Sequence, residues 1–161
     1  MNIVLVEPEI PPNTGNVARL CAATKTRLHL IEPLGFLLDD KQLKRAGMDY
    51  WEQVDWRRWP NWAAFQEKLP PGARLWFVES DGPLVYAEAK FAPDDYLVFG
   101  RETAGLPRQL LEQNRERWLR IPMFNDASRS LNLSNCAAIV LYEALRQQGF
   151  EIQNLKLQIQ N

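Results

Sequence analysis

Short runs of aliphatic and aromatic residues recur along the chain, and each run ends at a turn or a polar break. Runs of this length predict buried strands at Ile3–Val6, Leu28–Ile31, Leu75–Val78, Tyr96–Phe99 and Leu119–Ile121. Because consecutive positions are apolar, both faces of the sheet are expected to be covered. This pattern favours parallel strands with helices on each side.

Segments with apolar residues at helical spacing separate these runs. They predict helices at Asn16–Ala23, Asp40–Ala46, Trp62–Leu69, Leu106–Gln113 and Asn135–Gln148. The alternation of strands and helices is typical of an α/β fold, and we expect a single domain over residues 1–150. Residues 151–161 are polar with scattered aliphatics, and we expect them to form a weakly held C-terminal tail.

The composition restricts the classes of function. The chain has 161 residues, with 19 Lys and Arg against 20 Asp and Glu, and a formal net charge of −1. This excludes a strongly basic coat, so a nucleic acid would have to bind at a local patch. No apolar run approaches the roughly 20 residues of a membrane span, and the first residues lack the features of a signal peptide. The isolated Cys21 and Cys136 are expected to be reduced thiols, which favours a cytoplasmic protein.

Several familiar motifs are absent. No Gly-x-Gly-x-x-Gly follows the first predicted strand, which disfavours a nicotinamide-dependent oxidoreductase. Gly100 and Gly105 have the spacing of a P-loop, but Leu106-Pro107 stand in place of Lys and Ser or Thr. The single histidine, His29, lies inside a predicted strand and is interpreted as a core residue. Nothing in the sequence supports a metal site.

Three polar segments, 11–19, 97–107 and 120–135, each lie at or after the end of a predicted strand. In open α/β sheets the carboxyl ends of the strands are where ligands bind. The first segment also fits an alternative without a ligand, namely a capped helix whose first turn carries a solvent-exposed arginine, Arg19. A structural turn needs one glycine of the second segment, whereas two would let a ligand approach the backbone. Helix capping accounts for one polar residue of the third segment, which has several.

Together these segments resemble the three ordered motifs of the SPOUT methyltransferase superfamily. The matching strings are Asn13-x-Gly-Asn-x-x-Arg19, Phe-Gly-x-Glu102-x-x-Gly-Leu-Pro and Ile-Pro-Met followed by Ser130-Leu-Asn132-Leu-Ser-Asn. The short length, the string Glu-Pro-Glu-Ile-Pro-Pro-Asn-Thr-Gly-Asn and the segment Arg45–Tyr50 narrow the match. The chain resembles the tRNA (cytidine/uridine-34)-2′-O-methyltransferases from about residue 2 to residue 148.

This resemblance implies a fold, a cofactor and partners. It implies an α/β domain with a parallel sheet, helices on both faces and a C-terminal trefoil knot, although knots are rare among proteins. It implies S-adenosylmethionine as co-substrate, without a metal, and transfer of its methyl group to the ribose 2′-hydroxyl of the wobble nucleotide in the anticodon stem-loop of tRNA. It also implies a homodimer, expected to be built largely on the last helix, in which each active site is completed across the interface.

The resemblance also assigns residues to the site. Those that would bind the cofactor, largely through backbone groups, are Val78, Gly100, Ile121 and Ser130. The functional side chains fall on Asn13, Arg19, Glu102, Ser130 and Asn132. One departure concerns RNA binding, because Ala104 stands where relatives often have a basic residue.

The residues themselves leave the roles of two of these side chains open. Arg19 would act as the base in one view of the family. In the alternative it grips a flanking phosphate while a phosphate oxygen or water takes the proton, because a guanidinium stays protonated. Glu102 is expected to organise its loop or the third motif. Alternatives for the whole protein are 2′-O-methylation of another tRNA or rRNA nucleotide, or a non-catalytic RNA-binding knot protein.

Two basic segments are candidates for RNA binding. Lys41, Lys44 and Arg45 would form a stripe on one helix face, and Arg57-Arg58 lie among Trp51, Trp56, Trp59 and Trp62. Interleaved aromatic and basic residues can stack on unpaired bases and neutralise phosphates. The alternative is an ordinary solvated helix face, with Trp62 in an apolar stripe.

Overall fold

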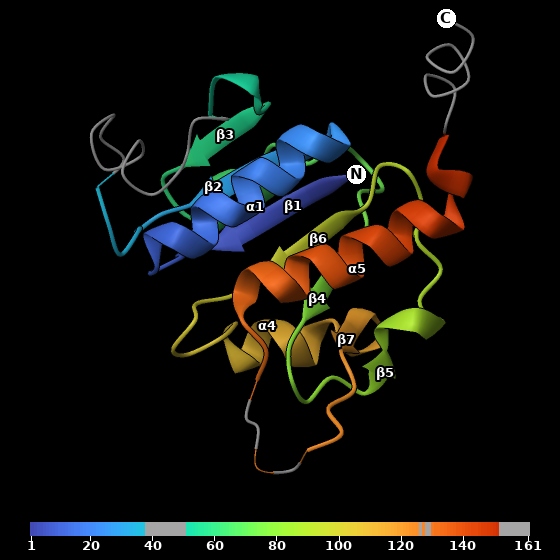
Figure 1. Cartoon of the computed structure of the whole chain (residues 1–161). Coiled ribbons are helices and arrows are strands. Elements are labelled where there is room, and N and C mark those ends of the chain that lie inside the picture. Colours follow the sequence, from blue (N-terminus) through green and yellow to red (C-terminus); the bar gives the residue numbers. More distant parts are fainter. Residues whose placement is uncertain (38–50, 126, 128–129, 152–161) are drawn as a thin grey trace, which may run out of the picture.

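A seven-stranded sheet forms the centre of the molecule in the computed structural model, which describes residues 1–37, 51–125, 127 and 130–151. The strand order is β3-β2-β1-β6-β4-β7-β5, and every neighbouring pair is parallel (Figure 1). The strands are β1 (Asn2–Val6), β2 (Arg27–Ile31), β3 (Trp56–Trp59), β4 (Leu75–Val78), β5 (Leu84–Val85), β6 (Tyr96–Phe99) and β7 (Trp118–Arg120). The predicted parallel sheet is confirmed, and the five predicted strands are all present.

The strands β3 and β5, at the two edges of the sheet, were not predicted. The sequence of β3 is Trp-Arg-Arg-Trp, and its two arginines are exposed. Strand β5 has only two residues, both half-buried. An edge strand borders solvent, so it does not need the continuous apolar run by which the central strands are recognised.

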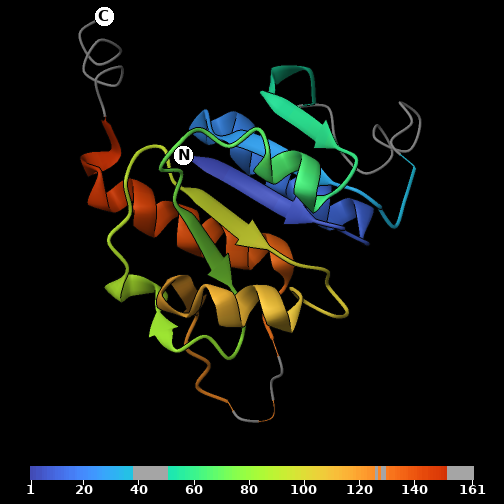
Figure 2. The ribbon, with the colours of Figure 1, turned by 180° about the vertical axis from the view of Figure 1, so that it is seen from behind.

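Helices cover both faces of the sheet, as predicted. They are α1 (Pro11–Thr24), α3 (Trp62–Gln66), α4 (Arg108–Gln113) and α5 (Leu133–Gln147), with short 3₁₀ helices at Trp51–Gln53, Tyr86–Glu88, Arg115–Arg117 and Gly149–Glu151. Helices α1 and α5 share one core with the sheet, and α3 and α4 share the other (Figures 1 and 2). The predicted helix Asp40–Ala46, with Lys41, Lys44 and Arg45, lies outside the described residues.

Helix α1 begins at Pro11, five residues before the predicted start at Asn16. The two prolines suggested a stiff loop, but they occupy the first two helical positions, where a missing N–H costs nothing. Asn13 is therefore on the first turn of the helix. Arg19 is not on the first turn, where it was expected, because the earlier start places it two turns further along.

The core histidine is confirmed. His29 is buried on β2; its Nδ1 accepts a hydrogen bond from Trp59 Nε1 (3.1 Å), and its Nε2 lies 3.3 Å from Asn2 Oδ1. Burial, with a smaller effect of Arg27 and Arg57, lowers the pKa of His29 to about 4. The ring is thus neutral at physiological pH, and its Nε2–H donates to Asn2. Cys21 and Cys136 are both free thiols.

The chain after β4 packs closely on β7. Strand β7 lies between β4 and β5, although both precede it in sequence. A Cβ atom added at Gly82 would overlap the carbonyl carbon of Leu119, and Arg120 Nη1 donates to the carbonyl oxygens of Gly82 (2.7 Å) and Pro83 (2.8 Å). The expected trefoil knot, in which the third-motif segment threads a loop, stays a prediction.

Candidate functional site

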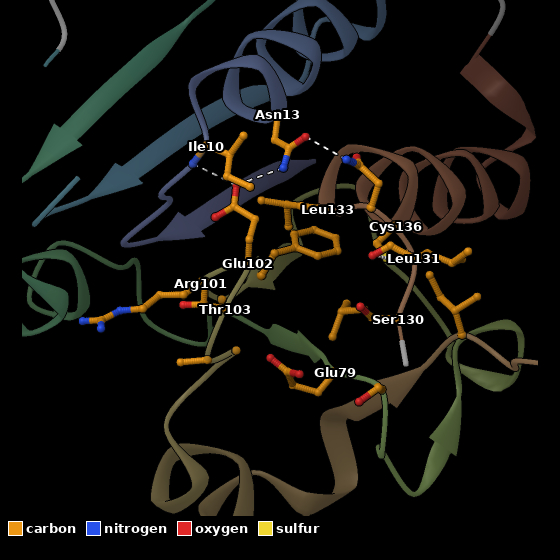
Figure 3. A pocket seen from close by; sticks show the side chains of 18 of the residues that line it. Ile10, Asn13, Glu79, Arg101, Glu102, Thr103, Ser130, Leu131, Leu133 and Cys136 are labelled. Carbon is orange, nitrogen blue, oxygen red and sulfur yellow. Dashed lines mark hydrogen bonds between the residues drawn. The ribbon is translucent and has the colours of Figure 1, made fainter. Parts of the chain in front are cut away.

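A cavity of about 500 Å³ lies at the carboxyl ends of β4, β6 and β7, beside the first turn of α1 and the start of α5 (Figure 3). Cavities of this size, with apolar walls and a few converging polar groups, are typical of small-molecule sites. The walls are apolar at Val78, Phe99, Ile121, Leu131 and Leu133. Backbone of the turn 100–105 closes one side.

The structure brings together all of the predicted site residues except Arg19. Those that line the cavity are Asn13, Val78, Gly100, Glu102, Ile121, Ser130 and Asn132. They come from segments far apart in the chain, and the parallel sheet places the ends of their strands along one edge. The three polar segments of the sequence therefore form one site.

Glu102 holds the start of α1. Its carboxylate accepts hydrogen bonds from the backbone N–H groups of Glu9 (2.8 Å) and Ile10 (3.2 Å) and from Asn13 Nδ2 (3.1 Å). The N-cap residue Ile10 has no side-chain acceptor of its own, and Glu102 fixes the start of the helix by binding the backbone N–H of Ile10 and of the residue before it. Glu102 was expected to organise its own loop or the third motif; its hydrogen bonds go instead to the first motif.

Asn13 links Glu102 to the third motif. While its Nδ2 donates to Glu102, its Oδ1 accepts a hydrogen bond of 2.8 Å from Asn132 Nδ2 (Figure 3). Asn132 is also the N-cap of α5, because its Oδ1 accepts from the backbone N–H of Ser134 (2.8 Å). One chain of hydrogen bonds, Glu102–Asn13–Asn132, thus joins all three motifs at the cavity.

The glycines of the second motif serve the protein's own backbone. Arg101 and Gly105 exchange backbone hydrogen bonds of 3.3 and 2.9 Å, which close the turn 101–105. A Cβ atom at Gly100 would overlap the carbonyl carbon of Gly105, and Gly105 has a positive φ of 67°. We expected these glycines to admit a ligand; the structure shows that Gly100 admits the backbone of Gly105 as well as lining the cavity.

A second set of contacts joins the segment before α1 to the turn 101–105, and the sequence analysis did not predict it. Glu9 Oε2 accepts hydrogen bonds from the backbone N–H (3.0 Å) and hydroxyl (2.7 Å) of Thr103, and Arg101 forms an ion pair with Glu7. Glu7 and Glu9 stand just before the first motif, in the string that narrowed the family match. That string was the feature of the sequence from which a role for these two glutamates could have been predicted.

Glu79 is the other residue that sequence reasoning missed. It follows β4 directly and lines the cavity (Figure 3). It accepts a hydrogen bond of 2.7 Å from the backbone N–H of Leu106. Burial raises its pKa, against the lowering effect of its backbone hydrogen bonds. Its place just after a buried strand was a usable signal, since ligands bind at strand ends.

Arg19 does not line the cavity. It lies on the exposed side of α1, together with Asn16, whereas Asn13, Val17 and Ala18 face the interior. At a rise of about 1.5 Å per residue, six residues separate Arg19 from Asn13 by roughly 9 Å along the helix. If Arg19 takes part in the reaction, it therefore contacts a molecule that binds at the exposed side of α1.

The tryptophans near Arg57 and Arg58 pack mainly within the protein. The rings of Trp51 and Trp56 lie 4.5 Å apart and pack against the core that the sheet shares with α1 and α5, and Trp59 donates a hydrogen bond to His29. Trp62 packs against the core that the sheet shares with α3 and α4, as the alternative of an apolar stripe predicted. Arg58 forms an ion pair with Glu32.

The described residues contain no group of three His, Cys, Asp or Glu side chains arranged to hold a metal ion. Among the helices that the structure describes, none has the length and apolarity that a membrane crossing requires.

Comparison with known proteins decides the family. The profile of the SpoU rRNA Methylase family matches residues 1–142. The chain belongs to this family. It is 55% identical, over 92% of its length and 96% of the relative's, to a protein of Saccharophagus degradans named tRNA (cytidine(34)-2′-O)-methyltransferase.

Solved structures of the family agree with the fold. A structure concerned with the 2-OH methylation of C/U34 on tRNA matches with a TM-score of 0.87 and 48% identity, over 93% of this chain and 97% of that one. The AdoMet-bound rRNA methyltransferase of Sinorhizobium meliloti matches with a TM-score of 0.70 and 25% identity, over 90% of this chain and 55% of that one. The predicted family and fold class are confirmed.

Proposed function

We propose that the protein transfers a methyl group from S-adenosylmethionine to the ribose 2′-hydroxyl of nucleotide 34 in tRNA. The observation that carries this proposal is the 55% identity, over nearly the full length of both chains, to a tRNA (cytidine(34)-2′-O)-methyltransferase. The chain Glu102–Asn13–Asn132, which joins the three motifs at one cavity, supports it. The alternative of a non-catalytic RNA-binding protein gives no reason to keep these side chains together.

The cavity fits the proposed co-substrate. Its volume of about 500 Å³ suits a nucleoside with an amino-acid side chain. Val78 and Ile121 offer apolar walls for the adenine, and Gly100 and Ser130 offer backbone groups for its polar atoms. When bound, S-adenosylmethionine supplies a methyl group already activated on a sulfonium sulfur. No metal is needed for this transfer.

The protein's part in the reaction is to position a weak nucleophile. The methyl group passes from sulfur to the ribose oxygen, the thioether S-adenosylhomocysteine remains, and the hydroxyl proton leaves. Asn13 and Asn132 hold the first and third motifs at the cavity. Arg19 binds a flanking phosphate of the anticodon stem-loop through its guanidinium, and a phosphate oxygen or water takes the proton.

A homodimer explains the place of Arg19. This residue lies on an exposed helix face outside its own cavity, so it can serve the cavity of a second copy. Tyr142 on α5 is 49% exposed, and Leu145 lies half-buried one turn further. We place the interface on α5 and its neighbours, and the reaction in the cytoplasm.

One experiment tests the proposed function. Purified protein is incubated with labelled S-adenosylmethionine and total tRNA, and the labelled nucleoside is mapped by mass spectrometry. We expect the label on the ribose of nucleotide 34. A synthetic anticodon stem-loop with a 2′-deoxyribose at position 34 is the matched control and should take up no label. Label on a base, or on another nucleotide, would contradict the assignment.

A further inference from the structure

Glu79 brings a carboxylate into the cavity, whose lining combines apolar and polar groups. It lies at the end of β4, and its side chain is half-buried where it lines the cavity with Ser130 and Cys136 (Figure 3). Neither the family motifs nor the predicted cofactor residues include it. The backbone of the second motif holds its side chain in place, because Oε1 accepts a hydrogen bond from the backbone N–H of Leu106 and the carboxylate packs against Gly105.

The charge of Glu79 is not paired within the part of the chain that the structure describes. Arg101 pairs with Glu7, and Arg108 pairs with Asp81 and Glu112. The influence of Glu79 reaches the neighbouring lining: the pKa of Cys136 rises to about 11 through burial and, next, the negative charge of Glu79. The other cavity carboxylate, Glu102, already has three N–H donors at the start of α1.

The ligands of the proposed reaction differ by one positive charge. S-adenosylmethionine carries a sulfonium, whereas the product S-adenosylhomocysteine has a neutral thioether in its place. The ammonium and carboxylate of the amino-acid end are present in both and largely offset each other. A partly desolvated carboxylate attracts a nearby cation far more strongly than one in water. A carboxylate in this cavity therefore acts on the charge that the reaction removes.

We infer that Glu79 makes the cavity select the sulfonium co-substrate over the thioether product. The inference rests on the proposed function. It adds a residue that makes the affinity for S-adenosylmethionine higher than the affinity for S-adenosylhomocysteine. Methyl transfer removes the cation that Glu79 attracts, so the product is held less tightly and leaves. Glu79 is thus a specificity residue for the co-substrate and takes no part in moving the methyl group or the proton.

Calorimetric titration with both ligands tests this inference. Glu79→Gln keeps the size of the side chain and an acceptor for Leu106 but removes the charge. We expect it to weaken S-adenosylmethionine by about tenfold, the scale of one close charge interaction, and S-adenosylhomocysteine by about twofold or less. Glu79→Asp keeps the charge and should retain the preference for the sulfonium.

Asp81→Asn is the matched control. Asp81 is two residues away, is 57% exposed at its side chain, pairs with Arg108, and does not line this cavity. Its removal should change both affinities by less than about twofold, since exposed charges are well screened. This control separates a specific effect of Glu79 from a general loss of negative charge.

The outcomes distinguish the inference from the proposed function. Equal weakening of both ligands in Glu79→Gln, or a wild-type protein without preference for the sulfonium, would overturn the inference while methylation of tRNA still stands. A wild-type protein that binds neither ligand would overturn the proposed function, and the inference with it. If Glu79→Gln does not fold, the preference in wild type and its retention in Glu79→Asp decide the matter.

Discussion

Asn132, at the start of α5, donates a hydrogen bond of 2.8 Å to Asn13 on the first turn of α1, 119 positions earlier in the chain. The same asparagine caps α5 through its Oδ1, so one side chain both ends a loop and ties two helices together. Because Asn13 is held in turn by Glu102, a change at any of the three residues is transmitted to the others. Local stability and the geometry of the cavity are therefore coupled here.

Two substitutions separate the functions of Asn132. Asn132→Ala removes both the cap and the link, and should lower the free energy of unfolding by about 2 kcal/mol while methylation falls. Asn132→Asp keeps the cap but places a carboxylate against Asn13 Oδ1, so the free energy of unfolding should fall by only about 1 kcal/mol, the cost of the lost link, while methylation falls about tenfold. Urea unfolding and single-turnover rates measure the two effects.

The matched control is Asn135→Ala, an exposed asparagine on the first turn of the same helix. It should change neither quantity appreciably. If Asn132→Asp methylates tRNA at the wild-type rate, the link to Asn13 has no part in the reaction.

Glu102→Gln is expected to loosen the start of α1. A glutamine can accept one of the backbone hydrogen bonds, but its NH₂ group then faces a second N–H donor, which is left unsatisfied. We expect the free energy of unfolding to fall by about 1–3 kcal/mol, measured by urea denaturation. Glu112→Gln, an exposed carboxylate paired only with Arg108 in the described residues, is the control and should lie within about 0.5 kcal/mol of wild type. A Glu102→Gln variant as stable as this control would refute the role of Glu102 in fixing the start of α1.

His29 makes stability depend on pH. Its pKa is lowered to about 4 in the folded state, against about 6.5 in an unfolded chain. The unfolded state therefore binds a proton first as the pH falls, so stability is complete above pH 6.5 and is lost down to about pH 4. The whole effect amounts to roughly 3 kcal/mol.

His29→Gln can accept from Trp59 but does not titrate, and His29 is the single histidine of the chain. Unfolding free energies of the two proteins between pH 7 and 4 should therefore converge as the pH falls. Parallel curves would show that the ring does not titrate differently in the two states.

The apolar pattern predicted the central sheet because each of its strands is covered on both faces, and it placed the three motifs at strand ends. It could not place the start of α1, because Pro11 and Pro12 fit a stiff loop as well as a first helical turn. That error displaced Arg19 from its true position. Glu9 and Glu79 were missed because a single sequence does not show which polar residue near a strand end turns toward the cavity, as Glu79 does, or toward a neighbouring loop, as Glu9 does.

The quaternary structure is tested at Tyr142. Sedimentation of the wild type at micromolar concentration should give a dimer. Tyr142→Asp places a charge on the exposed side of α5 and should shift the protein to a monomer, because an unpaired charge in an interface is costly to desolvate. Lys68→Glu, an exposed residue just after α3 on the opposite face of the sheet, should leave the dimer intact. A monomeric wild type would contradict the proposed assembly.

Arg19→Ala should separate cofactor binding from catalysis, because Arg19 lies outside the cavity lining. We expect the affinity for S-adenosylmethionine to stay within a few-fold, while methyl transfer falls by a factor of about 100 or more. Arg19→Lys should restore only part of the rate, since an ammonium cannot form a bidentate grip on phosphate. Calorimetry and single-turnover rates give the two measurements, and a parallel loss of both would show that Arg19 supports the cavity instead.

Mixing two inactive variants shows which subunit supplies Arg19. Gly100→Ala should lose cofactor binding, because its Cβ overlaps Gly105 and disturbs the turn 101–105. If each cavity uses the partner's Arg19, a mixed dimer of Arg19→Ala and Gly100→Ala has one site with both defects and one site with neither. Random mixing makes half of the dimers mixed, so about a quarter of the wild-type activity should return. If Arg19 served its own cavity, every site would carry one defect, and no activity would return on mixing.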